Sequence, residues 1–194
     1  MIEIEKKFLI NQPTLKKITR KAELISQQKL VDIYYDTVDF KLTTKDWWLR
    51  NRNGKFELKV SVIGSKSSID QYQEIDKEKE IYQYLKINLE KSLLEALKQN
   101  NISPFATIVS ERKKYKKDDF TIDFDITDFG YSICEVELMV EDESKIDQAL
   151  IKIDNFRKEN SFRDDRVRGK LIEYIYRNNL QHYQTLQAAG VIKD

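Results

Sequence analysis

Cysteine and histidine are almost absent from this sequence, and glycine and proline are scarce. Its 194 residues include a single cysteine, Cys134, and a single histidine, His182, with five glycines and two prolines. One cysteine excludes an internal disulfide. Zinc sites built on cysteine and histidine, and hydrolases that pair a nucleophile with a histidine base, lack the residues they require. A metal site in this chain would therefore use carboxylates, which favour hard cations such as Mg²⁺ or Mn²⁺.

Long apolar runs and an excess of one charge are also missing. No segment approaches the ~20 apolar residues that span a bilayer, and the N-terminus lacks the pattern of a signal peptide. We therefore expect a cytoplasmic protein without membrane contact. The 34 Lys+Arg and 33 Asp+Glu residues nearly cancel, which argues against a nucleic-acid partner. The length and the 40% hydrophobic content predict one folded domain over residues 1–194, which we expect to be a monomer.

Apolar residues that recur with the periods of strands and helices predict about eight strands and four or five helices. The strands are expected at residues 2–10, 30–37, 46–53, 55–62, 70–76, 105–117, 119–127 and 131–140. Asn53-Gly54, between two of these strands, predicts a tight hairpin turn. The helices are expected at residues 14–27, 77–100, 144–159 and 170–189, the second with a break near Asn88, and a loop is expected at 64–68.

Most of these strands alternate ionised and apolar side chains. The residues that share a charged face are Glu3, Glu5 and Lys7; Trp48, Arg50 and Arg52; Glu57 and Lys59; Asp123 and Asp125; Glu135 and Glu137. An antiparallel sheet with one face in water gives the same alternation. However, the charges are segregated by sign between strands, and short acids recur in mid-strand, where they are disfavoured. We therefore predict an α+β fold with a closed eight-stranded antiparallel β-barrel, a tunnel with a charged interior, and helices packed outside.

The charged faces contain the groups that bind a polyphosphate. Arg50, Arg52 and Lys59 can donate to phosphate oxygens, and arginine can bind two of them at once. Carboxylates on the other strands can hold one or two divalent cations that bridge and screen these oxygens. These carboxylates are Glu3, Glu5, Asp123, Asp125, Glu135 and Glu137. A triphosphate would need both sets of groups, which agrees with the small net charge.

The N-terminal strand carries an ExExK pattern, from Glu3 to Lys7, and the basic and acidic strands follow it in order. In this the chain resembles the CYTH superfamily, also called triphosphate tunnel metalloenzymes, over nearly its whole length. Within the superfamily it is most similar to the animal-type thiamine triphosphatases. The segments that carry this similarity are YYDT at 34–37, WWLRNR at 47–52, FELK at 56–59, SERKKY at 110–115 and DFDITDFGYSICEVELMV at 123–140. The tail from Lys170 resembles that family's C-terminal helix, which plugs one end of the tunnel.

The resemblance implies a role for individual residues. It implies metal binding by Glu3, Glu5, Asp123, Glu135 and Glu137, with Asp125 either a ligand or a residue behind them. It implies that the triphosphate is gripped by Lys7, Arg50, Arg52, Arg112 and Lys170, with Glu74 as a further acid. Lys59, near Tyr34, would act at the scissile phosphate. Trp48 would stack on the thiamine ring, a cation suited to a tryptophan face.

The implied activity is Mg²⁺-dependent hydrolysis of thiamine triphosphate to thiamine diphosphate and phosphate. An inorganic tripolyphosphatase, another organic triphosphate hydrolase and a non-catalytic polyphosphate- or nucleotide-binding module remain as alternatives. Asn51 stands where relatives often have arginine, which leaves the selectivity for the organic group open. Cys134 is expected to be an inert buried thiol and His182 a surface residue.

Overall fold

The computed structural model describes residues 1–62, 70–88 and 92–192. Its strands are β1 (Ile2–Phe8), β2 (Glu23–Asp36), β3 (Trp47–Arg52), β4 (Lys55–Ser61), β5 (Asp70–Ile75), β6 (Ser103–Lys117), β7 (Phe120–Thr127) and β8 (Ser132–Val140). Its helices are α1 (Gln12–Ile18), α2 (Glu78–Leu85), α3 (Leu93–Gln99), α4 (Ile146–Glu159), α5 (Lys170–Asn178) and α6 (Leu180–Ala188), with short 3₁₀ helices η1 (Thr43–Lys45) and η2 (Glu143–Lys145). The loop expected at 64–68 lies outside the described residues.

The eight strands pair in the order β1-β5-β4-β3-β2-β6-β7-β8 and form a closed barrel. Closure follows from β1, which pairs with β5 on one side and with β8 on the other. All of the pairs are antiparallel. The predicted closed antiparallel arrangement of eight strands is therefore confirmed, and a closed sheet leaves no open edge for another strand to join.

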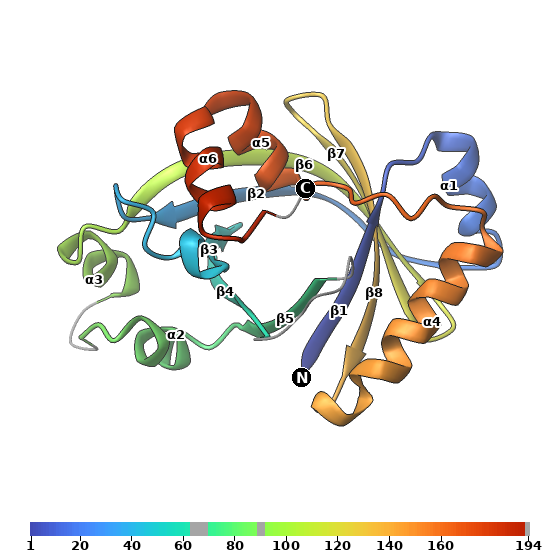
Figure 1. Ribbon diagram of the computed structural model, residues 1–194, viewed down its shortest axis with the longest axis horizontal. Coiled ribbons are helices and arrows are strands. Elements are labelled where there is room, and N and C mark those ends of the chain that lie inside the picture. Colours follow the sequence, from blue (N-terminus) through green and yellow to red (C-terminus); the bar gives the residue numbers. More distant parts are fainter. Residues whose placement is uncertain (63–69, 89–91, 193–194) are drawn as a thin grey trace.

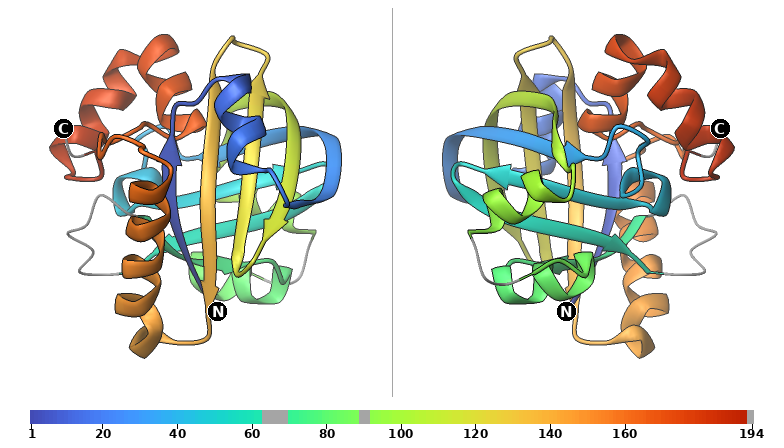
Figure 2. Two further views of the ribbon diagram at one scale, coloured as in Figure 1. Left: turned by 90° about the vertical axis from the view of Figure 1, so that its right-hand side faces the viewer. Right: turned by 90° about the vertical axis from the view of Figure 1, so that its left-hand side faces the viewer.

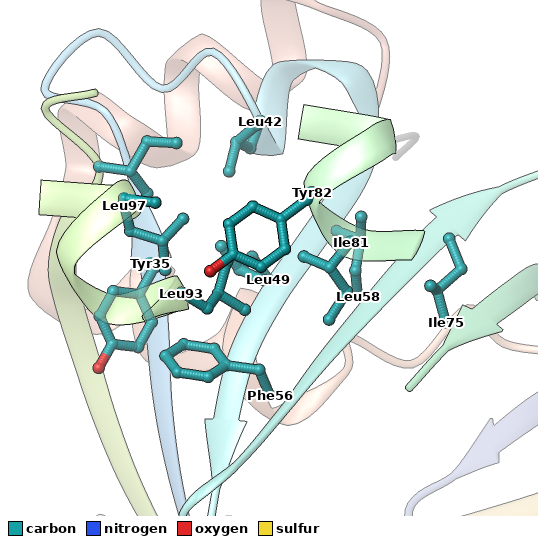
Figure 3. Close-up of a cluster of buried hydrophobic side chains, with 12 residues drawn as sticks. Tyr35, Leu42, Leu49, Phe56, Leu58, Ile75, Ile81, Tyr82, Leu93 and Leu97 are labelled. Carbon is teal, nitrogen blue, oxygen red and sulfur yellow. The ribbon is translucent and has the colours of Figure 1, made fainter. Parts of the chain in front are cut away.

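The helices lie outside this ring of strands (Figure 1, Figure 2). Helices α2 and α3 cover β3, β4 and β5 through an apolar cluster that includes Leu49, Leu58 and Leu97, shown in Figure 3. Helices α1 and α4 cover β1, β7 and β8 through two further clusters. The last cluster joins β2 and β6 to α5 and α6. In the first three clusters outward-facing side chains are buried under helices, whereas the last contains Tyr34, which faces the cavity. Burial of these apolar side chains is the main favourable contribution to the fold.

The predicted hairpin turn at Asn53-Gly54 is confirmed. Both residues have positive φ, 49° and 92°, which suits a two-residue turn between twisted strands. The Asn53 side chain also accepts a hydrogen bond of 2.8 Å from the backbone N–H of Val31. The turn is therefore tied to β2, the strand next to β3 in the ring.

Two of the predicted helices were wrong in extent. The helix expected over 14–27 ends at Ile18, and β2 begins at Glu23 because its first residues pair with the end of β6. Ile25 is on that strand and is 51% exposed. The helix expected over 170–189 breaks at Asn179, which has φ −146° and ψ 81°, and whose side chain caps α6. Such non-helical geometry is typical of an N-cap residue.

The expectation that His182 lies on the surface was also wrong. The break at Asn179 turns α6 toward the segment between β2 and β3, and His182 is fully buried there. Its Nε2 lies 2.8 Å from Thr43 Oγ1, and its ring stacks on Phe40 at 3.8 Å between centroids. Burial lowers the pKa of His182 to about 4. Cys134 is buried as expected.

None of the described helices combines the length and the apolarity needed to cross a membrane.

Candidate active site

A cavity of about 1140 Å³ is lined by side chains from all eight strands. On β1, Glu3, Glu5 and Lys7 line it, while Ile4 packs outward against α4. The two adjacent tryptophans show the same alternation. Trp48 lines the cavity, and Trp47 packs outward, 6.0 Å from the ring of Tyr84. The period of two along each strand therefore decides which residues reach the cavity.

The cavity brings together nearly all of the residues selected from the sequence. Those that line it are Glu3, Glu5, Lys7, Tyr34, Trp48, Arg50, Arg52, Lys59, Glu74, Arg112, Asp123, Glu135, Glu137 and Lys170. Asp125 is the exception. It is buried in the wall, where its two carboxylate oxygens accept from Arg112 at 2.6 Å each and one of them also accepts from Lys170 at 3.0 Å.

Two groups of carboxylates meet on β1, β7 and β8. The first is Glu3, Glu5 and Glu137, and the second is Asp123, Glu135 and Glu137, each with oxygens within 4.8 Å of one another. Glu137 belongs to both groups. Burial, and then the charges of Glu3, Asp123 and Glu135, raise its pKa well above the usual value. Like charges this close disfavour ionisation of all members at once.

These residues fit a divalent cation. Burial raises the pKa of Glu3 to about 7, against the opposing effect of Lys59, and Glu5 and Glu74 add to the rise. Asp123 Oδ1 is buried and has no hydrogen-bond partner in the described part of the chain. A cation between the two groups would relieve the repulsion and give this oxygen a partner, and oxygen ligands of this kind suit Mg²⁺ or Mn²⁺.

The cationic side chains on β1, β3 and β4 are each held by an acid. Lys59 lies 2.5 Å from Glu3 and 3.3 Å from Glu74, and Lys7 lies 2.5 Å from both Glu5 and Asp70. Burial opposes the charge of Lys59, but Glu3 and Glu5 outweigh it, so its pKa is raised well above the usual value. Lys59 therefore stays protonated and can neutralise an anion in the cavity.

A buried ionic network in the wall of the cavity holds three further cationic side chains, Arg52, Arg112 and Lys170. Asp32 is fully buried, accepts from Arg52 at 2.6 and 2.9 Å, and lies 2.8 Å from Lys170 Nζ. Arg112 binds Asp123 as well as Asp125. Burial alone would raise the pKa of Asp125, but Arg112 and Lys170 lower it to about 2. The network holds Arg52, Arg112 and Lys170 in fixed positions.

Sequence reasoning missed several polar residues of the cavity and its wall. They are Asp32, Asp46, Asp70 and Tyr72. A signal existed for all four, because each has the parity of a selected residue on the same expected strand: Asp32 that of Tyr34, Asp46 that of Trp48, and Asp70 and Tyr72 that of Glu74. The structure places Asp46 in the turn that precedes β3, from which it still lines the cavity. Lys59 and Tyr34, expected to work together, both line the cavity, but Lys59 contacts Glu3, Glu74 and the ring of Tyr72.

The segment from 161 to 168 and the C-terminal helices also reach the cavity. The segment is fixed by an ion pair between Lys6 and Asp164 and by a 2.7 Å hydrogen bond from Tyr131 Oη to the carbonyl of Arg168. Leu171 on α5 and Tyr183 on α6 add apolar lining beside Trp48. One part of the cavity is therefore ionic and another part is aromatic and apolar.

Comparisons with known proteins agree with this arrangement. Residues 1–169 match the family model of the CYTH domain. Human thiamine-triphosphatase is 29% identical over 205 aligned residues, which cover 96% of this chain and 89% of the human protein. The thiamine-triphosphatase of Macaca fascicularis is 28% identical with the same coverage. A solved structure from Pyrococcus horikoshii superposes with a TM-score of 0.69 at 22% identity and covers 91% of this chain and 99% of its own.

Proposed function

Because the chain belongs to the CYTH family, we propose that it hydrolyses thiamine triphosphate to thiamine diphosphate and phosphate in a reaction that depends on Mg²⁺. The observation that carries the proposal is the composition of the cavity. Buried carboxylate groups, protonated lysines and arginines, and one tryptophan face converge in a space of about 1140 Å³. The similarity to two thiamine-triphosphatases supports the choice of the organic group.

The triphosphate would lie along the basic side chains of the cavity. These are Lys7, Arg50, Arg52, Lys59, Arg112 and Lys170. In the absence of substrate each is paired with an acid, so a bound triphosphate would exchange part of these ion pairs for phosphate contacts. Arginine suits this role because its planar group can bind two phosphate oxygens together. Glu74, which is 40% exposed at its side chain, lies 3.9 Å from Arg50 and would be the easiest acid to displace.

The metal would be held by Glu3, Glu5, Asp123, Glu135 and Glu137. When bound, a divalent cation neutralises phosphate oxygens and makes a bound water more acidic. Asp125 would act behind these ligands, since it orients Arg112 and Lys170. We propose Mg²⁺ as the ion, with Mn²⁺ as a substitute, because both prefer oxygen ligands.

The protein's own contribution to the reaction would be positioning and charge neutralisation. Attack by water on the terminal phosphorus forms a new P–O bond, and the bond to the bridging oxygen breaks. The leaving thiamine diphosphate then gains negative charge. Lys59 stays protonated and would stabilise that charge, and Tyr34, which lines the same cavity, would help to orient the phosphate.

Helices α5 and α6 would close one end of the cavity. Leu171 and Tyr183 support this proposal because they line the cavity from α5 and α6. Lys170, the first residue of α5, is tied to β2 and β7 through Asp32 and Asp125. The apolar side chains of the two helices would exclude water from the organic group beside Trp48.

Phosphate release from thiamine triphosphate, ATP and inorganic tripolyphosphate, each with Mg²⁺, Mn²⁺ or Ca²⁺, tests the proposed function. We expect the highest kcat/KM for thiamine triphosphate with Mg²⁺. A preference for tripolyphosphate would identify an inorganic tripolyphosphatase instead. Binding without phosphate release under all three metals would identify a non-catalytic binding module.

The role of Lys59 can be tested against a second lysine on the same strand. Lys59→Ala should lower kcat by at least about 100-fold, since charge stabilisation at the reacting phosphate contributes several kcal/mol. Lys55→Ala is the matched control, because Lys55 lies outside the cavity and pairs with Asp76 on the surface. Equal rates for the two variants would show that Lys59 does not act at the phosphate.

A further inference from the structure

Asp46 occupies a fixed position at the start of β3, in the turn that leads into the strand. It has φ 60° and ψ 40°, the left-handed region, which is uncommon for a residue other than glycine. Its N–H donates to the carbonyl of Thr43 at 3.0 Å, and its carbonyl accepts from the N–H of Ser61 at 3.3 Å. The backbone of Asp46 is thus held both by η1 and by the end of β4.

The carboxylate of Asp46 joins two aromatic residues of the cavity. Its Oδ1 accepts from the indole Nε1–H of Trp48 at 2.8 Å and from the hydroxyl of Tyr72 at 3.1 Å. Burial, and then the charges of Asp70 and Asp46, raise the pKa of Tyr72 well above the usual value. Tyr72 therefore keeps its proton and remains a donor. All three side chains line the cavity.

These two hydrogen bonds fix the indole plane of Trp48, because Tyr72 holds the carboxylate oxygen that the indole N–H binds. Trp48 packs on one side against the cluster of α5 and α6, whose members include Tyr34 and Leu171. A hydrogen bond at Nε1 sets the rotation of the ring about its side-chain bond, so the indole presents the same face to the cavity. A rigid aromatic face loses little conformational entropy when a ligand ring stacks on it.

The charge of Asp46 also acts on the ligand. In the described part of the chain no lysine or arginine forms an ion pair with Asp46, in contrast to Asp70, which binds Lys7. A carboxylate at the N–H edge of an indole increases the electron density on its face, which strengthens attraction of a cation placed over the ring. Burial raises the pKa of Asp46, the hydrogen bonds from Trp48 and Tyr72 favour its carboxylate form, and the negative charge of that form attracts the same cation through the cavity.

We infer that Asp46 is a specificity-determining residue that orients Trp48 and makes this part of the cavity select triphosphates whose organic group is a cationic aromatic ring. The inference rests on the proposed function and names the property of thiamine that the site would recognise, its positively charged ring. A neutral aromatic group such as adenine could stack on the same face but would gain no attraction from Asp46. Inorganic tripolyphosphate would not use Asp46 at all.

Two substitutions separate orientation from charge. Asp46→Asn keeps an oxygen that can accept from Trp48 and Tyr72 and removes only the charge. Asp46→Ala removes both. Asp39→Asn is the matched control, since Asp39 is an exposed residue in the preceding segment and does not line the cavity.

The experiment measures kcat/KM of the wild type and the three variants on thiamine triphosphate, ATP and tripolyphosphate. We expect Asp46→Asn to lower kcat/KM about fivefold for thiamine triphosphate, the size of a cation–π and surface charge effect, and to leave tripolyphosphate within about twofold. Asp46→Ala should lose more on both organic substrates. Equal losses of Asp46→Asn on all three substrates, or an unchanged ratio of thiamine triphosphate to tripolyphosphate, would overturn the inference.

A binding measurement distinguishes failure of the inference about Asp46 from failure of the proposed function. If the wild type releases no phosphate from thiamine triphosphate, the proposed function fails, and calorimetry with thiamine diphosphate and inorganic diphosphate then decides the role of Asp46. Weaker binding of thiamine diphosphate alone in Asp46→Asn supports the inference. Equal changes for both ligands contradict it.

Discussion

Substitution of Glu137 by glutamine should separate metal binding from folding. Glu137 is the residue that the two carboxylate groups share. Its pKa is raised well above the usual value, first by burial and then by Glu3, Asp123 and Glu135. Burial and these three acids therefore favour the protonated side chain in the metal-free protein. Glutamine is neutral and has the shape of the protonated carboxyl, so the metal-free stability should change by less than about 1 kcal/mol.

The effect on metal binding should be much larger. At a Mg²⁺ concentration 100-fold above Kd, binding stabilises the folded protein by about 2.7 kcal/mol. If loss of the shared carboxylate weakens Mg²⁺ binding about 100-fold, the same concentration stabilises the variant by only about 0.4 kcal/mol. For a chain of this length the difference corresponds to a loss of roughly 5 to 9 °C in the Mg²⁺-induced shift of Tm. Phosphate release should fall by at least about 100-fold.

The assay is thermal unfolding of the wild type and Glu137→Gln with EDTA and with increasing Mg²⁺, combined with phosphate release. Glu141→Gln is the matched control, because Glu141 follows β8 directly and does not line the cavity. We expect the control to behave as the wild type in both measurements. A Mg²⁺-induced Tm shift in Glu137→Gln equal to that of the wild type would refute the assignment of the metal to these carboxylates.

Three further predictions concern single residues. Arg52→Ala should abolish phosphate release while circular dichroism shows a folded protein, because Lys170 remains beside Asp32; normal turnover would remove Arg52 from the phosphate site. Trp48→Ala should lower kcat/KM more for thiamine triphosphate than for tripolyphosphate, and equal losses would exclude stacking on the organic group. The contribution of His182 to the free energy of unfolding should fall by up to about 3 kcal/mol as the pH drops from 6.5 to 4, because the unfolded chain protonates His182 first. In urea unfolding across this range the stability of the wild type should therefore fall relative to that of His182→Asn, and a constant difference between the two would contradict the assigned burial of an uncharged imidazole.

The ring of strands was predictable because the period of two repeats on nearly every strand. Leu49, for example, faces α2 and α3 because its neighbours Trp48 and Arg50 face the cavity. The extents of the helices were less predictable, since tertiary pairing decides them. The residues from Glu23 onward have helical periodicity but join β2 because β6 offers hydrogen-bond partners for them. At Asn179 the side chain caps a new helix, and this competes with continuation of α5.

The candidate site was predictable where residues lie on strands and less so elsewhere. Strand parity identifies residues that share a face, as for Glu135 and Glu137. Strand parity does not show which acids bind a buried lysine or arginine and which lie beside other acids. Asp125 is of the first kind, since it binds Arg112, and Glu137 is of the second. Asp46 has the parity of Trp48 on the strand expected at 46–53, but its hydrogen bond to the indole depends on a left-handed turn that periodicity does not describe.

The central claim is tested most directly by incubating the purified protein with thiamine triphosphate and Mg²⁺ and measuring both products over time. The account predicts equimolar release of phosphate and thiamine diphosphate, loss of both with EDTA, and a lower kcat/KM for inorganic tripolyphosphate. If thiamine triphosphate stays intact while Mg²⁺ is bound and tripolyphosphate is cleaved, the cavity serves a different substrate. If neither compound is cleaved under any divalent metal, the claim of triphosphate hydrolysis is contradicted.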